Sequence, residues 1–158
     1  MSTIRFYVLG VPAPQGSKTA IVRGNKAILL DGASAAARSK HAQWRQSVAA
    51  AAREAAAGAA PIPYPVAVTI VFRFPMPASR SKKDRALGWL WKPSTPDADK
   101  LLRSTFDGLT DGGLITDDRI IVSIVATKIE VEGWTGASIE VKPAGAFLQW
   151  LALDRNLP

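Results

Sequence analysis

Apolar side chains follow two patterns along the chain, and the shorter pattern predicts strands. Runs rich in β-branched and aromatic residues, each ended by glycine, proline or a polar turn, occur at residues 4–11, 19–22, 27–30, 66–74, 119–131 and 134–142. The run at 66–74 is almost uninterrupted, so we expect it at the centre of a sheet. The polar turns at 23–26 and 132–133 predict that the strands on either side of each turn pair as antiparallel hairpins.

The second pattern is helical and begins with residues 33–57, which are rich in alanine. Alanine has the highest helix propensity, and Asp31 or Ser34 can cap the first turn. Trp44 and Val48 lie four residues apart and mark the predicted buried face. The small alanine surface is also suited to close packing against another helix, within the chain or across a dimer.

A further helix is predicted from about residue 96, with Leu102, Phe106 and Leu109 recurring at the spacing of one helical face. Pro96 suits the first turn of this helix. The glycines that follow Asp111 predict its end, because glycine readily adopts the left-handed conformation found at helix C-termini.

The predicted elements indicate one domain. A last apolar run at 146–153 predicts a short C-terminal helix, and no repeat or linker divides the 158 residues. The predicted order is therefore β-β-β-α-β-α-β-β followed by the small helix. We expect a single α/β domain of the mixed α+β type over residues 1–158, in which helices pack on a mixed β-sheet.

Acidic residues are concentrated around the second predicted helix, although the net charge of the chain is +7. Six of the thirteen acidic residues lie between residues 93 and 122, namely Asp97, Asp99, Asp107, Asp111, Asp117 and Asp118. Carboxylates are the ligands that Mg²⁺ prefers, and a basic surface suits a polyanion. The combination predicts a metal-dependent nuclease, although each acid taken alone is more typical of a helix cap or turn.

The position of these acids predicts how a site would form. One acidic pair lies at the start of the helix, and the other precedes the strand at 119–131. The apolar link Leu114-Ile115 can dock on the core and bring the second pair towards the first.

The residue types that the chain lacks exclude several kinds of site. There is no cysteine, so a disulfide, a thiolate metal site and a cysteine nucleophile are excluded. The single histidine, His41, cannot supply a site of several histidines. No signal-peptide pattern is present, and no run reaches the roughly 20 apolar residues that span a bilayer. We therefore expect a cytoplasmic protein with no membrane partner.

The acidic segment resembles the RusA-type Holliday-junction resolvases. The family pattern has two acids followed by a leucine, then a lysine, then an apolar residue with Asp-x-Leu, and finally Asp-Asp. The chain follows this pattern over residues 96–101, at Arg103, and over 106–109 and 116–118. The resemblance implies a RusA-like fold, a homodimer, and Mg²⁺-dependent endonuclease activity on branched DNA, with Mn²⁺ as a substitute metal.

By position, the resemblance implies catalytic acids and metal ligands at Asp97, Asp99 and Asp118, with Asp117 as an additional candidate ligand. Arg103 stands where the family has its catalytic lysine. Arginine keeps the positive charge but does not lose its proton at working pH, so it can stabilise a phosphate without transferring a proton. Lys100 replaces the usual asparagine, which removes the polar contact made by that residue.

Basic residues outside the acidic segment predict a DNA surface. The segment 78–95 reads as a loop rich in positive charges, with Trp89 and Trp91 between the last two of them. The predicted DNA contacts are Lys18, Arg80, Lys82, Lys83, Arg85, Lys92 and Lys100. An exposed indole can stack on an unpaired base, but for the two tryptophans we favour packing in the core or a dimer. The helical stripe Arg38, His41 and Arg45 is predicted to be a solvated face.

The predicted function follows from the resemblance and the charge pattern. Resolving a four-way junction takes two symmetric nicks, which a two-fold dimer with two sites supplies. We therefore expect a dimeric Mg²⁺-dependent endodeoxyribonuclease that acts on Holliday junctions in recombination and repair. The alternatives are a less selective structure-dependent DNase and a junction-binding protein without activity. A hydrolase of small phosphate esters is disfavoured by the excess of basic residues.

Overall fold

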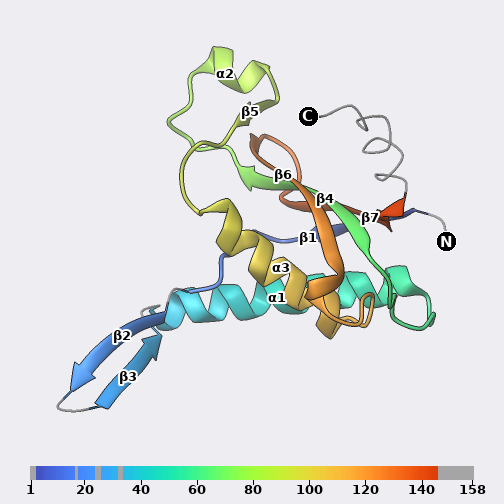
Figure 1. Ribbon diagram of the computed structural model, residues 1–158. Coiled ribbons are helices and arrows are strands. Elements are labelled where there is room, and N and C mark those ends of the chain that lie inside the picture. The colour runs from blue at the N-terminus through green and yellow to red at the C-terminus, as the bar shows by residue number, and fades with distance from the viewer. Residues whose placement is uncertain (1–2, 17, 24–25, 32–33, 146–158) are drawn as a thin grey trace, which may run out of the picture.

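The computed structural model describes residues 3–16, 18–23, 26–31 and 34–145 (Figure 1). Its elements are β1 (Ile4–Leu9), β2 (Lys18–Arg23), β3 (Lys26–Asp31), α1 (Ala35–Ala56), β4 (Val66–Pro75), α2 (Lys82–Ala86), β5 (Trp89–Trp91), α3 (Ala98–Asp111), the short 3-10 helix η1 (Asp118–Ile120), β6 (Ile121–Val131) and β7 (Gly136–Pro143). The predicted order is confirmed, with α2 and β5 added where a loop was predicted. The predicted C-terminal helix at 146–153 lies outside the described residues.

Five strands form a mixed sheet in the order β1-β7-β4-β6-β5, and β2 and β3 form a separate antiparallel hairpin. This hairpin extends away from the larger sheet (Figure 1). β4 lies at the centre, as its continuous apolar run predicted. It pairs in parallel with β6 and antiparallel with β7. The fold is therefore a small α+β domain.

The predicted hairpin between the last two strands is wrong. β6 and β7 are not neighbours, because β4 lies between them and pairs with both. The physical reason is the burial of β4, whose residues from Val66 to Val68 and at Ile70 and Phe72 are buried. An apolar strand of this kind is most stable with a partner on each side, since a position at the sheet edge would expose its unpaired backbone.

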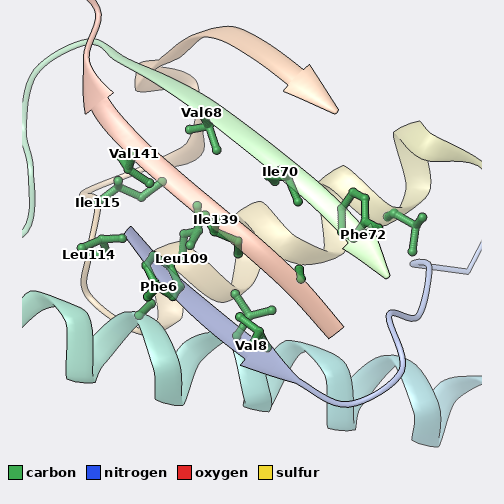
Figure 2. Close-up of a cluster of buried hydrophobic side chains, with 14 of the residues drawn as sticks. Phe6, Val8, Val68, Ile70, Phe72, Leu109, Leu114, Ile115, Ile139 and Val141 are labelled. Atoms are coloured by element: carbon green, nitrogen blue, oxygen red, sulfur yellow. The ribbon is translucent and has the colours of Figure 1, made fainter. Parts of the chain in front are cut away.

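The core lies between this sheet and the helices α1 and α3. Alternate residues of β1, β4 and β7 point into it, as the two-residue period of a strand requires. Figure 2 shows Phe6 and Val8 of β1, Ile139 of β7 and Leu109 of α3 in the same buried cluster. From α1, Trp44 and Val48 are 2% and 0% exposed, so their predicted burial is confirmed.

Helix α1 begins and ends as its sequence predicts. Ser34 caps the first turn, because its hydroxyl oxygen accepts a hydrogen bond from the backbone N–H of Ala37 at 3.2 Å. Its long alanine face also packs against a helix of the same chain. A Cβ added to Gly108 of α3 would lie 2.7 Å from the side chain of Val48, so glycine at this position allows the two helices to approach closely.

The buried face of α3 differs slightly from the predicted face. Leu109 is buried, as expected, but Leu101 takes the place of Leu102, which is only partly buried together with Phe106. Three small residues, Ser104, Thr105 and Gly108, are buried on the same face, and Gly108 lies against Val48 of α1. The helix ends where the glycines predicted, and Gly113 has the left-handed φ of 72°.

Candidate active site

Asp97 occupies the N-cap position of α3, yet within the described chain its carboxylate makes no capping hydrogen bond. Its Oδ2 instead accepts a hydrogen bond from Nζ of Lys100 at 2.8 Å. This hydrogen bond lowers the pKa of Asp97 and raises the pKa of Lys100. An N-terminal aspartate normally caps the backbone, so a carboxylate turned to the surface is available for another role.

Asp99 and Arg103 lie one helical turn apart on α3, and both are exposed. Residues four positions apart share one face of a helix. The first turns of α3 therefore present two carboxylates, from Asp97 and Asp99, and one guanidinium to solvent. Three of the four residues that the resemblance marks as catalytic are thus grouped at one end of this helix.

The second acidic pair lies in the turn before β6. Asp117 caps η1, and its Oδ1 accepts a hydrogen bond from the backbone N–H of Arg119 at 2.9 Å. Asp118 is exposed in the first turn of η1, which packs against α3. Leu114 and Ile115 are 2% and 1% exposed, so the predicted docking of this link on the core is confirmed.

The docking of the link does not by itself build a metal site. Among the described residues, no three carboxylate or histidine side chains form a group that could hold a metal ion. The metal set implied by the resemblance, Asp97, Asp99 and Asp118 with Asp117, therefore stays a prediction. Its donors are all carboxylate oxygens, which is the chemistry that Mg²⁺ prefers.

Two further acids of the segment have a structural role. Arg45 of α1 forms an ion pair with Asp111 and donates a hydrogen bond to Asp107 at 3.3 Å. The hydrogen bond from Arg45 lowers the pKa of Asp111, and the pKa of Arg45 is raised in return. Because these contacts join α3 to α1, Asp107 and Asp111 are accounted for by packing. Arg45 is correspondingly not part of a purely solvated stripe.

Lys128 of β6 is a site residue that the sequence reasoning missed. Its Nζ donates hydrogen bonds to the backbone carbonyl oxygens of Ser94 at 2.9 Å and Pro96 at 2.7 Å. The same positive charge contributes to the lowered pKa of Asp97. Lys128 therefore holds the segment that leads directly into Asp97. The local signal was a single lysine within the strand, which does not reveal a partner more than thirty residues away.

Several predicted DNA-binding residues are held by carboxylates at the end of β6. Glu130 is only 2% exposed, and it binds Arg80 at 2.8 Å and Lys92 at 3.8 Å. Arg85 pairs with Glu132. A buried carboxylate requires such partners, so these three cations anchor the segment 77–92 to the sheet.

The remaining cations of this group differ in their surroundings. Lys82 and Lys83 are exposed in α2, and Lys18 opens β2. The exposed charges of Lys82 and Lys83 are placed to meet a polyanion. The DNA-binding assignment of all these residues stays a prediction.

The two tryptophans of β5 are on the surface. Trp89 is 48% exposed and Trp91 is 65% exposed, so the predicted packing in the core is wrong. Their rings form an edge-to-face pair with centroids 5.1 Å apart. The three-residue strand β5 sits at the edge of the sheet, where only one side has a partner strand to cover its side chains. Packing in a dimer stays a prediction.

A protein-family model described as "Endodeoxyribonuclease RusA" matches residues 13–142. No curated protein matches the chain. In the described part of the chain, no helix is both long and apolar enough to cross a membrane. The matched range contains all the acidic and basic residues discussed above.

Proposed function

This chain belongs to the RusA endodeoxyribonuclease family, and we propose that it is a homodimeric, Mg²⁺-dependent enzyme that resolves four-way DNA junctions by paired symmetric nicks. The observation that carries the proposal is the start of α3. There Asp97 faces the surface instead of capping its helix, beside the exposed Asp99 and Arg103. These residues fall at the positions that the family motif marks as catalytic.

We assign roles to the residues from their chemistry. Asp97, Asp99 and Asp118 would hold the Mg²⁺ ion, with Asp117 as a further candidate. When bound, such an ion polarises the phosphate and lowers the pKa of a coordinated water. Arg103 stays charged at every working pH, so it would neutralise the scissile phosphate rather than move a proton.

The basic residues supply the affinity for DNA. With a net charge of +7, the protein is expected to bind nucleic acid with a strong dependence on salt, because each phosphate contact releases a counterion. Lys82, Lys83 and Lys100 lie exposed or half-exposed on the described surface and are the first candidates for phosphate contacts. Lys18 is a further candidate. Mutating these residues should weaken binding without changing where the DNA is cut.

The test is the nicking of a synthetic four-way junction, with each strand labelled in turn. In Mg²⁺, wild-type protein is expected to cut two opposing strands symmetrically, and EDTA is expected to abolish the cuts. Asp97→Asn should bind the junction and leave it intact. Asp111→Asn is the matched control, because it removes a carboxylate of the same helix that is bound to Arg45. This control should still nick the junction.

Two results would replace the proposal. If linear and three-way DNA are cut as fast as the four-way junction, the protein is a less selective structure-dependent DNase. If wild-type protein binds the junction but nicks no strand in Mg²⁺ or Mn²⁺, it is a junction-binding protein.

One contact favours this binding protein as the second candidate, namely the ion pair between Lys100 and Asp97. Lys100 stands where the family has asparagine, and its ammonium occupies one oxygen of a predicted metal ligand. A metal must therefore compete with this ion pair. If this competition limits activity, Lys100→Asn should nick the junction at a lower Mg²⁺ concentration than wild type. An unchanged Mg²⁺ dependence would show that Lys100 does not restrain the site.

A further inference from the structure

A cleft of about 840 Å³ opens beside Asp97 and Lys100. Four segments form its walls: the chain after β1, the first half of α1, the end of β4 and the segment that leads into α3. Each of these segments is part of the described chain, and three of them are distant from Asp97 in sequence. The cleft is therefore a product of the tertiary structure, and no sequence motif predicts it.

The inner surface of the cleft is apolar and its charges are positive. Trp44 and Phe74, which are 2% and 5% exposed, contribute buried aromatic side chains to the lining. The charged lining residues are Lys40, Lys92, Lys100 and Asp97, which give three positive charges and one negative charge. An apolar recess with a surplus of positive charge fits a flat, uncharged ring that is joined to an anionic group.

One of these lysines is already held in place. The side chain of Lys92 is only 14% exposed, and its Nζ lies 5.1 Å from the ring centre of Phe74 and 3.8 Å from the buried carboxylate of Glu130. A cation fixed in this way keeps its position before a ligand arrives, which reduces the entropy lost on binding. The backbone N–H of Lys92 is also bonded to the carbonyl oxygen of Lys128 at 3.0 Å. The sheet therefore holds Lys92, and with it this wall of the cleft, in position.

We propose that the cleft receives one unpaired nucleotide next to the phosphate that is cut, with its base against the apolar lining and its phosphate near the lysines. The proposal rests on the proposed function, because it presupposes that branched DNA binds at the start of α3. Gln43 also lines the cleft. Its amide can both donate and accept hydrogen bonds, so it is placed to distinguish one base from another.

Such a site would give the enzyme a preference for branched DNA. Taking a base out of an intact duplex requires unstacking and unpairing, whereas a base at a branch point is already partly free. A linear duplex would therefore fill the cleft at a larger cost than a junction. The cleft would select the substrate by the availability of a base, while the basic surface binds any DNA.

The test combines DNA junctions that lack one base with a protein variant in which the cleft is filled. Ala37 lines the cleft on the exposed surface of α1, so Ala37→Phe should fill the cleft without disturbing the core. Ala42→Phe is the matched control, since Ala42 is also exposed on the same helix and is not a lining residue. Four-way junctions would carry an abasic site at one of the nucleotides on either side of the cut.

We expect one abasic position to slow nicking by wild type and by Ala42→Phe about tenfold, a loss typical of a stacked base. Ala37→Phe should cut the normal junction more slowly and should be indifferent to the abasic site. The inference is overturned if no abasic position slows wild type, or if Ala37→Phe responds to the abasic site as wild type does.

A second measurement distinguishes a failure of the cleft proposal from a failure of the proposed nuclease function. The affinity of each protein for normal and abasic junctions would be measured in EDTA, where no cutting is needed. If no junction is nicked under any condition, the proposed nuclease function fails. An affinity loss at one abasic position that disappears in Ala37→Phe would still support the cleft. Equal affinities for all junctions would overturn it.

Discussion

Lys128 provides the most direct test of how the fold positions the candidate site. Replacing it by methionine keeps most of the apolar stem and removes the ammonium group. The change deletes the hydrogen bonds to the carbonyl oxygens of Ser94 and Pro96, at 2.9 and 2.7 Å. The segment that enters α3 at Asp97 then keeps the backbone bond from Lys92 to β6 but loses these two bonds close to Asp97. We expect both the stability of the fold and the rate of nicking to fall.

The magnitude follows from the surroundings of the two bonds. A hydrogen bond from a charged donor contributes about 1.5–3 kcal/mol when both partners are protected from water. The contact to Ser94 is exposed and the contact to Pro96 is part-buried, so water can replace much of the first. We therefore expect a loss of about 2 kcal/mol in the free energy of unfolding, near the lower end of that range. For a domain of this size the corresponding decrease in Tm is about 4–8 °C.

The assay pairs thermal unfolding with nicking kinetics on the four-way junction. In Lys128→Met, kcat should fall about tenfold, as expected when a catalytic group is misplaced, while the Kd for the junction stays close to the wild-type value. Lys128→Arg restores a charged donor and should recover part of both losses. Lys142→Met is the control, because Lys142 forms a partly exposed pair with Glu140 at 3.5 Å, and pairs near the surface contribute little.

Two results would refute the reasoning at different points. If Lys128→Met unfolds at the wild-type temperature, the two hydrogen bonds do not hold the segment. If the variant loses stability but retains its full kcat, Lys128 supports the fold and does not position Asp97.

Two further predictions concern the contact between α1 and α3. Gly112→Ala places a Cβ 2.6 Å from the carbonyl oxygen of Ala49, so urea unfolding should show that the free energy of unfolding falls by about 1–3 kcal/mol. The control is Gly133→Ala, whose added Cβ meets no described atom within 4 Å and which should leave the stability nearly unchanged. The hydrogen bond from Arg45 lowers the pKa of Asp111, so the pair stabilises the fold above the ordinary carboxyl pKa of about 3.9 and loses this effect as the pH falls through the lower folded value. The difference in unfolding free energy between wild type and Asp111→Asn should therefore shrink between about pH 5 and pH 2, and a constant difference would show that the pair contributes nothing.

Much of the local structure could be predicted from the sequence because short-range rules decide it. The Ser34 cap, the long alanine helix and the left-handed Gly113 at the end of α3 depend only on nearby residues. The central place of β4 followed from its unbroken apolar run. The acidic motif was also a local signal, and the family match over residues 13–142 confirms the family to which it pointed.

The arrangement of distant segments was decided only by the tertiary structure. The turn at 132–133 predicted a hairpin, but β4 gains a partner on both sides by separating β6 from β7. Nothing local could show this, because strand pairing depends on which arrangement buries the most apolar surface and pairs the most backbone groups. The exposure of Trp89 and Trp91 follows from the position of β5 at the edge of that sheet.

The same division applies to the candidate site. The sequence by itself determined that carboxylates gather around α3, and that they match a family pattern. Only the folded chain separated their roles, since Arg45 binds Asp107 and Asp111 from a helix more than sixty residues away. It also brought Lys128 to the segment before Asp97. Charges and hydrogen bonds act over a few ångströms, so their partners are set by packing, whereas helix and strand periodicity is already present in the order of the residues.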